Sequence, residues 1–123
     1  MSNTRFDIGL KNLEKIDGLA GEKVIQNLES IAPQVGKHII EFAFGEIYAS
    51  DKLNLREREI ITVACLLSQG DTKNQLIVHI NGCLNVGLTQ EEVIEVFTQC
   101  IPYVGFPKVL NAIYTAQEVF NSL

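Results

Sequence analysis

The sequence has no long hydrophobic run and no surplus of basic residues. A helix needs roughly 20 consecutive apolar residues to span a bilayer, and no run approaches that length, so we expect no membrane partner. The net charge of −5 and the pI near 4.9 argue against nucleic acid or an anionic membrane as a partner, since both require a basic face. The N-terminus, MSNTRFDIGL, lacks the basic-then-apolar layout of a signal peptide. We therefore expect a soluble, cytoplasmic protein.

The three cysteines, Cys65, Cys83 and Cys100, lie 18 and 17 residues apart and form neither a CxxC nor a metal-type spacing. This argues against a disulfide framework and favours reduced thiols in a cytoplasm. The sequence also lacks a Gly-rich phosphate loop, a nucleophile elbow and an HExxH motif. No metal and no cofactor are indicated.

The fold class follows from the spacing of apolar residues, which is helical almost throughout, while strict alternation is hard to find. We expect one all-α domain over residues 1–123, with six or seven helices. The predicted helices cover 6–16, 24–31, 35–47, 54–69, 72–86, 89–101 and 107–120. An apolar fraction of 46% is high for so small a chain, which suggests that some apolar surface is buried between subunits.

The helix boundaries carry their own signals. Asn54 with Glu57, and Thr89 with Glu92, have the spacing of capping boxes. Gly87 suits a left-handed cap. Pro102 should end or kink the sixth helix, and Pro107 suits the first position of the last one.

His79 is the first candidate for chemistry, because it lies at helical spacing from Leu76, Ile80 and Cys83 and so points toward the packed side. A histidine in a partly buried site, beside a carboxylate, is suited to acid/base work near neutral pH. The alternative is a core histidine satisfied by a backbone carbonyl.

Glu59 is the second candidate, because it shares a helical face with Thr62 and Val63 and could orient His79 or share its proton. Alternatively, it only complements the helix macrodipole or pairs with Arg56 or Arg58.

Cys83 follows His79 by one helical turn, a spacing that allows an imidazole to activate a thiolate. It is as well explained as a small buried hydrophobic residue. The turn YVGFP at 103–107 could line a pocket or a subunit interface, or simply form a corner between helices.

Residues 40–120 resemble the carboxymuconolactone decarboxylase family, within the superfamily that also holds the alkylhydroperoxidase D-like proteins. The resemblance is carried by Arg58-Glu59, by His79 with the helix up to Gly87, by the TQEEVIEV run at 89–96, and by the GFP turn. It implies an alkylhydroperoxidase D-like helical bundle that assembles as a homo-oligomer, a trimer or a hexamer.

The resemblance also implies a reaction: cofactor-free decarboxylation of γ-carboxymuconolactone to an enol-lactone, with the conjugated lactone as electron sink. His79 matches the family histidine and would donate the proton. Glu59 matches a polar position of the peroxidase branch, and Glu46 is a further carboxylate candidate near the same pocket.

The chain departs from the family pattern just before the histidine. The peroxidase branch has a CxxC where this chain has Thr72 and Gln75, and a dithiol peroxidase needs both thiols. The decarboxylases commonly have an acidic residue there, where this chain has Asn74 and Gln75.

The leading hypothesis is a decarboxylase-family enzyme that acts on a small carboxylated lactone or related acid. The alternatives are a thiol-dependent antioxidant protein, peroxiredoxin- or alkylhydroperoxidase-like, that uses Cys83, and a non-catalytic oligomeric protein that binds a small molecule.

Overall fold

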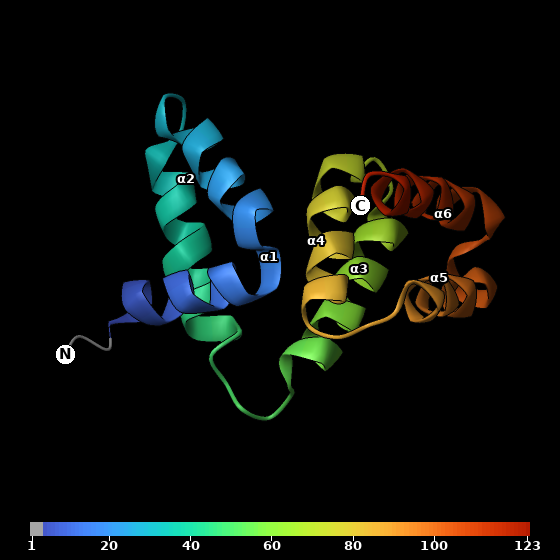
Figure 1. The fold of residues 1–123 in the computed structure, drawn as a ribbon, viewed down its shortest axis with the longest axis horizontal. Helices are drawn as coiled ribbons and strands as arrows, with labels where there is room; N and C mark the ends of the chain where they lie inside the picture. The colour runs from blue at the N-terminus through green and yellow to red at the C-terminus, as the bar shows by residue number, and fades with distance from the viewer. Residues whose placement is uncertain (1–3) are drawn as a thin grey trace. The chain divides into compact units, whose positions relative to one another are not determined.

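The structure is a computed structural model that describes residues 4–123. The described chain is helical with no strand, and the all-α prediction is confirmed (Figure 1). It divides into two compact units, the first up to Leu55 and the second from Arg56 to Leu123. The single domain over 1–123 stays a prediction. Residues 1–3, the start of the segment judged to lack a signal-peptide layout, lie outside the described range.

The first unit begins with α1 (Arg5–Glu29), which consists of two helical limbs that meet at Gly18. Gly18 has φ 54° and ψ −133°, a conformation that a residue with a side chain rarely adopts. The sharp bend between the limbs is visible in Figure 1. The prediction of two helices separated near Gly18 is thus confirmed.

After α1, the first unit contains two consecutive helical segments, α2 (Pro33–His38) and η1 (Ile39–Ile47), which follow each other without a break. The sequence predicts an ordinary helix over 35–47, but from Ile39 the backbone winds as a π-helix. The Tyr48 amide donates to the Ala43 carbonyl, five residues back, at 2.9 Å. Apolar spacing did not reveal this, because the prediction rested on ordinary helical spacing, and the buried Ile40 and Phe44 lie four residues apart, a separation that is also common in α-helices.

Two glycines set the distance between α1 and η1. A Cβ on Gly9 would lie 1.8 Å from the carbonyl oxygen of Ile40, and a Cβ on Gly45 would lie 2.1 Å from that of Arg5. The two backbones can therefore approach this closely only because both positions lack a side chain.

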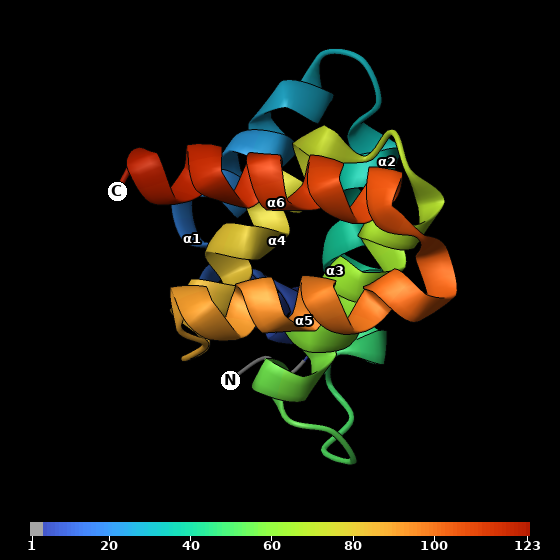
Figure 2. The same cartoon turned by 90° about the vertical axis from the view of Figure 1, so that its right-hand side faces the viewer.

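The second unit contains α3 (Leu55–Gln69), α4 (Lys73–Asn85), α5 (Gln90–Val104) and α6 (Phe106–Asn121). Figure 2 shows α5 and α6 running side by side in opposite directions. Their apolar faces meet α3 and α4 in one hydrophobic core. Its buried members are Val63, Leu67, Leu76, Ile80, Cys83, Leu88, Val93, Phe97, Val109, Ala112, Ala116 and Val119.

The α4–α5 connection confirms two predicted signals. Gly87 has φ 103°, and the amides of Gly87 and Leu88 donate to the carbonyls of Leu84 and Cys83, which is the Schellman pattern of helix ends. Thr89 and Glu92 then form the capping box, with both reciprocal bonds at 3.0 Å. The capping box at Asn54 and Glu57 stays a prediction.

The two prolines near the α5–α6 corner correct the predicted boundaries. Helix α5 continues through Pro102 to Val104, so the proline, which lacks a backbone donor, does not end it. Helix α6 begins at Phe106, so Pro107 is its second residue and not its first. Only Gly105, at φ 96°, separates the two helices, so the YVGFP segment is a helical corner.

Among the described residues, no helix combines the length and the apolar character needed to cross a membrane.

Candidate active site

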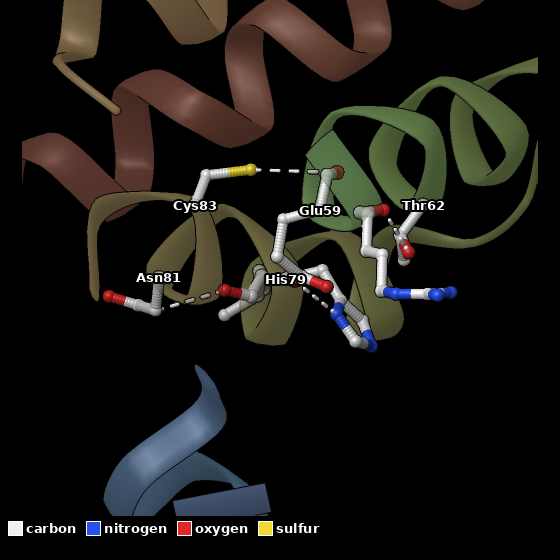
Figure 3. Close-up of polar contacts among 7 residues, drawn as sticks. Glu59, Thr62, His79, Asn81 and Cys83 are labelled. Carbon is white, nitrogen blue, oxygen red and sulfur yellow. Dashed lines mark hydrogen bonds and ion pairs between the residues drawn. The ribbon is translucent and has the colours of Figure 1, made fainter. Parts of the chain in front are cut away.

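Glu59 on α3 and His79 on α4 are in direct contact. His79 Nδ1 lies 2.8 Å from Glu59 Oε1, and Figure 3 shows the carboxylate turned toward the imidazole ring. In the tautomer that carries its proton on Nδ1, the ring donates to the Glu59 carboxylate. The sequence-based prediction that the two residues lie together on neighbouring helices is therefore correct in its geometry.

The burial of the two side chains is unequal. The Glu59 side chain is 0% exposed, while 18% of the His79 side chain remains accessible. A fully buried carboxylate is costly unless it is paired, and the imidazole supplies that partner. The pair thus combines a fixed, shielded carboxylate with a ring that still reaches solvent.

The contact bears differently on the simpler interpretations of the two residues. His79 has a carboxylate partner, where a core histidine was expected to meet a backbone carbonyl. Arg56, one of the arginines expected to pair with Glu59, instead forms an ion pair with Glu92 at the start of α5. Arg56 is thus engaged elsewhere, while the interpretation of Glu59 as a partner of Arg58 or of the helix dipole stays a prediction.

The position of His79 follows from the packing of α4. Leu76, Ile80 and Cys83, which lie three residues before, one after and four after the histidine, are all buried. They hold this side of α4 against the core, so the imidazole leaves the helix at the edge of the packed face. There it meets Glu59, which lies one turn before the buried Val63 on α3.

Cys83 also contacts Glu59, but at the backbone. Its Sγ lies 3.8 Å from the Glu59 carbonyl oxygen, on the other side of the residue from the carboxylate (Figure 3). Burial, and secondly the charge of Glu59, raise the pKa of the Cys83 thiol from 9.0 to about 12. A thiol with this pKa is almost wholly protonated at neutral pH, which argues against the predicted thiolate nucleophile.

The other two thiols are not part of this pair. Cys65 is exposed on α3, and Cys100 is half-buried on α5, where its Sγ donates to the Val96 carbonyl. Burial, and secondly the nearby Cys65, raise the pKa of the Cys100 thiol. All three cysteines are free.

Glu46 belongs to the first unit, at the end of η1. Its side chain is 52% exposed and forms an ion pair with Arg5 at 3.3 Å. A surface pair of this kind is what an ordinary solvent-exposed glutamate makes. A role for Glu46 beside His79 stays a prediction.

The sequence analysis placed positions 79 and 83 one helical turn apart but did not predict that Cys83 contacts the backbone of Glu59. Both can therefore touch the same residue of α3, one at its side chain and one at its backbone.

These features define a class: a small all-helical protein with a buried carboxylate–imidazole pair held by two adjacent helices. The sequence model of the carboxymuconolactone decarboxylase family matches residues 33–118. That match covers more than half of the chain and includes both Glu59 and His79. The chain belongs to the carboxymuconolactone decarboxylase family.

Individual relatives agree with this assignment. The chain is 32% identical over 117 residues to the 4-carboxymuconolactone decarboxylase of Acinetobacter baylyi, covering 92% of this chain and 87% of that protein. It is 27% identical over 121 residues to the nitrosuccinic acid decarboxylase npaB of Metarhizium robertsii, covering 96% and 82%. It is 30% identical over 86 residues to peroxisomal protein 2 of Saccharomyces cerevisiae, covering 69% of this chain and 30% of that protein.

Proposed function

We propose that this protein is a cofactor-free decarboxylase of a small carboxylated lactone or a related acid, with His79 as its acid/base and Glu59 as the residue that orients it. The contact of 2.8 Å between His79 Nδ1 and the buried Glu59 carboxylate carries the proposal. The two relatives named as decarboxylases, one of a carboxylated lactone and one of nitrosuccinic acid, support the reaction class.

The proposed chemistry needs one proton and one electron sink. The bond between the substrate carbon and its carboxylate breaks, carbon dioxide leaves, and the electron pair moves into the conjugated lactone. A carbon of that conjugated system then takes a proton. Since Nδ1 donates to Glu59, the other ring nitrogen, Nε2, delivers this proton as a general acid.

Glu59 serves this step in two ways. It fixes the tautomer and the orientation of the ring through Nδ1, as a carboxylate does for histidine in many acid/base sites. It also stabilises the imidazolium that must form before the proton is given up, because a buried negative charge acts strongly across a short distance.

The apolar surface of α6 supports a further part of the proposal, the homo-oligomer. Phe106, Leu110 and Tyr114 recur every fourth residue, and all three are exposed in the single chain. A trimer or hexamer that covers such a strip would have three or six times the chain mass of 13.7 kDa. Light scattering coupled to size exclusion measures this mass directly.

The activity test follows the ultraviolet absorbance of γ-carboxymuconolactone with four proteins: wild type, His79→Gln, Glu59→Gln and His38→Gln. Wild type and His38→Gln should consume the lactone at equal rates, because His38 is the other histidine and is exposed at the end of α2. His79→Gln should lose at least about 100-fold in rate, the scale of general acid catalysis.

Circular dichroism of each variant distinguishes a loss of chemistry from a loss of folding. A folded His79→Gln with the wild-type rate would overturn the role of His79. Absence of turnover in wild type, against this lactone and against nitrosuccinic acid, would overturn the substrate class.

A further inference from the structure

Glu59 is held against α4 at its backbone as well as at its carboxylate, and the backbone contact comes from Cys83. The Cys83 sulfur lies 3.8 Å from the Glu59 carbonyl oxygen, while His79 Nδ1 lies 2.8 Å from the Glu59 carboxylate (Figure 3). His79 and Cys83 are four residues apart on α4, so they share one face of that helix. A single turn of α4 therefore contacts both the backbone of Glu59 and its side chain.

The contact between Cys83 and Glu59 lies in a closely packed interior. Both residues are 0% exposed, and the core that includes Cys83 also holds the fully buried Val93 and Phe97 of α5. Because packed interiors contain few voids, a change in one side chain is transmitted to the atoms that it touches. A change at Cys83 is therefore felt at the Glu59 backbone.

The end of α4 holds Cys83 itself in place. The Cys83 carbonyl oxygen accepts from the Leu88 amide at 3.0 Å, and Gly87 between them has φ 103°. The capping box of Thr89 and Glu92 follows directly. The α4–α5 connection thus fixes the backbone from which the Cys83 sulfur reaches Glu59.

The Cys83 thiol keeps its proton at neutral pH and so remains a donor. Burial, and secondly the charge of Glu59, raise the pKa of this thiol to about 12. An S–H group is a weak donor, but a carbonyl oxygen has two lone pairs and can accept this bond in addition to a helical one. The Cys83 contact can therefore join α4 to α3 without breaking the backbone bonds of α3.

We propose that Cys83 is a positioning residue for the acid/base pair: its S–H group, bonded to the Glu59 carbonyl, holds this turn of α3 so that the Glu59 carboxylate meets His79 Nδ1. The inference rests on the proposed function, in which Nε2 acts on the substrate. Cys83 is buried behind Glu59 and acts only through it. Without the Cys83 bond the carboxylate loses its alignment, and the ring proton is no longer fixed on Nδ1, because the hydrogen bond at one ring nitrogen decides which nitrogen is protonated.

The ¹⁵N chemical shifts of the imidazole ring test this role without any substrate. The full chain is labelled with ¹⁵N-histidine and measured at a pH at which the rings are neutral, and His79→Gln assigns the signals. Wild type and Cys83→Ser, which keeps a donor at the γ position, should hold His79 mainly with its proton on Nδ1. Cys83→Ala should reduce the population of that tautomer at least about twofold. The exposed His38 should give the same tautomer ratio in every protein.

Cys100→Ala is the matched control. The Cys100 sulfur donates to the Val96 carbonyl of its own helix at 3.4 Å, so its loss should leave the His79 tautomer unchanged. Circular dichroism checks that each variant is folded. If Cys83→Ala unfolds, Cys83→Val fills the same space without a donor and carries the same expectation. An unchanged tautomer in the folded variant, an equal change in Cys100→Ala, or a Cys83→Ser as altered as Cys83→Ala would overturn the positioning role.

Turnover of γ-carboxymuconolactone links this role to the reaction. Cys83→Ala should lower kcat at least about tenfold, the scale of a small misplacement of a catalytic group, and leave KM unchanged, because Cys83 does not touch the substrate. Cys83→Ser should restore most of the rate. A changed tautomer with an unchanged kcat would overturn the link between Cys83 and catalysis. Absence of turnover in wild type would overturn the proposed function, and the tautomer measurement would still decide whether Cys83 positions the pair.

Discussion

The sulfur of Cys83 and the carbonyl oxygen of Glu59 lie 3.8 Å apart, so α4 holds Glu59 at two points, at the backbone through Cys83 and at the carboxylate through His79. This contact favours a structural role for Cys83 over a nucleophilic one. A fully buried thiol against a carbonyl oxygen, with a pKa raised to about 12, is a structural neighbour of the acid/base pair.

The first prediction concerns thiol reactivity. In the folded protein at pH 7.5, iodoacetamide should modify the exposed Cys65 at least tenfold faster than Cys83, since the reagent needs both access and a thiolate. Mass spectrometry of peptides after timed quenching measures the two rates. Modification of Cys83 at the rate of Cys65 would restore the thiol-dependent alternative.

The second prediction concerns stability at alkaline pH. The unfolded Cys83 thiol loses its proton near pH 9.0, whereas the folded thiol keeps it to about pH 12. Between these values the unfolded state binds fewer protons, so the free energy of unfolding falls as the pH rises. At pH 10 the loss from this one group is on the order of 1 kcal/mol.

Urea unfolding of wild type and Cys83→Ala at pH 8 and pH 10 isolates this contribution. The variant is less stable at pH 8, because its core has lost the sulfur, but its stability should fall by roughly 1 kcal/mol less between the two pH values. Equal falls in both proteins would contradict the raised pKa.

The third prediction tests the buried carboxylate. Glu59→Gln retains an oxygen that can accept from His79 Nδ1 and should change the free energy of unfolding little. Glu59→Leu leaves the Nδ1 donor without that partner and should cost about 1–3 kcal/mol more than Glu59→Gln. Urea unfolding at pH 7 measures the difference. Equal stability of the two variants would show that the contact does not stabilise the fold.

Much of this fold could be predicted because its signals are local. The capping box at Thr89, the cap at Gly87 and the break at Gly18 each depend on residues within one or two turns. The pairing of Glu59 with His79 was also accessible, since both residues occupy inward-facing positions on consecutive helices. Patterns of spacing were enough for both.

Other features depend on geometry that spacing does not encode. The π-helix of Ile39–Ile47 is defined by backbone hydrogen bonds such as that from the Tyr48 amide to the Ala43 carbonyl, which the identities of the apolar residues do not encode. The ion pair between Lys73 on α4 and Glu118 on α6 joins residues that are 45 positions apart in the sequence. Only the tertiary arrangement brings such residues together.

The fourth prediction concerns the close crossing of α1 and η1. Gly9→Ala would place a methyl group 1.8 Å from the Ile40 carbonyl oxygen, so the helices must move apart, at a cost of about 1–3 kcal/mol or more. Gly36→Ala is the matched control. Its methyl group would lie 3.7 Å from the nearest atom, Cδ1 of Ile25, an ordinary contact, so helix propensity should make this variant neutral or slightly more stable. Thermal unfolding of both variants checks this, and a Gly9→Ala variant as stable as Gly36→Ala would contradict the crossing geometry.

The last prediction concerns the capping box that starts α5. The Thr89 hydroxyl accepts from the Glu92 amide, while the Glu92 carboxylate accepts from the Thr89 amide, so Thr89→Ala removes one of the two bonds and weakens the constraint on the other. The expected cost is about 1 kcal/mol. Thr98→Ala is the control, because the Thr98 hydroxyl lies on the exposed side of the same helix and only donates back to the Ile94 carbonyl. That variant should change the stability by less than about 0.5 kcal/mol.

The pKa of Glu92 is lowered, first by the hydrogen bond from the Thr89 amide and then by the charge of Arg56. Glu92 therefore stays ionised across neutral pH, and the difference between the two threonine variants should persist there. Equal effects of the two substitutions in urea unfolding would show that the box contributes no more than an ordinary helical threonine.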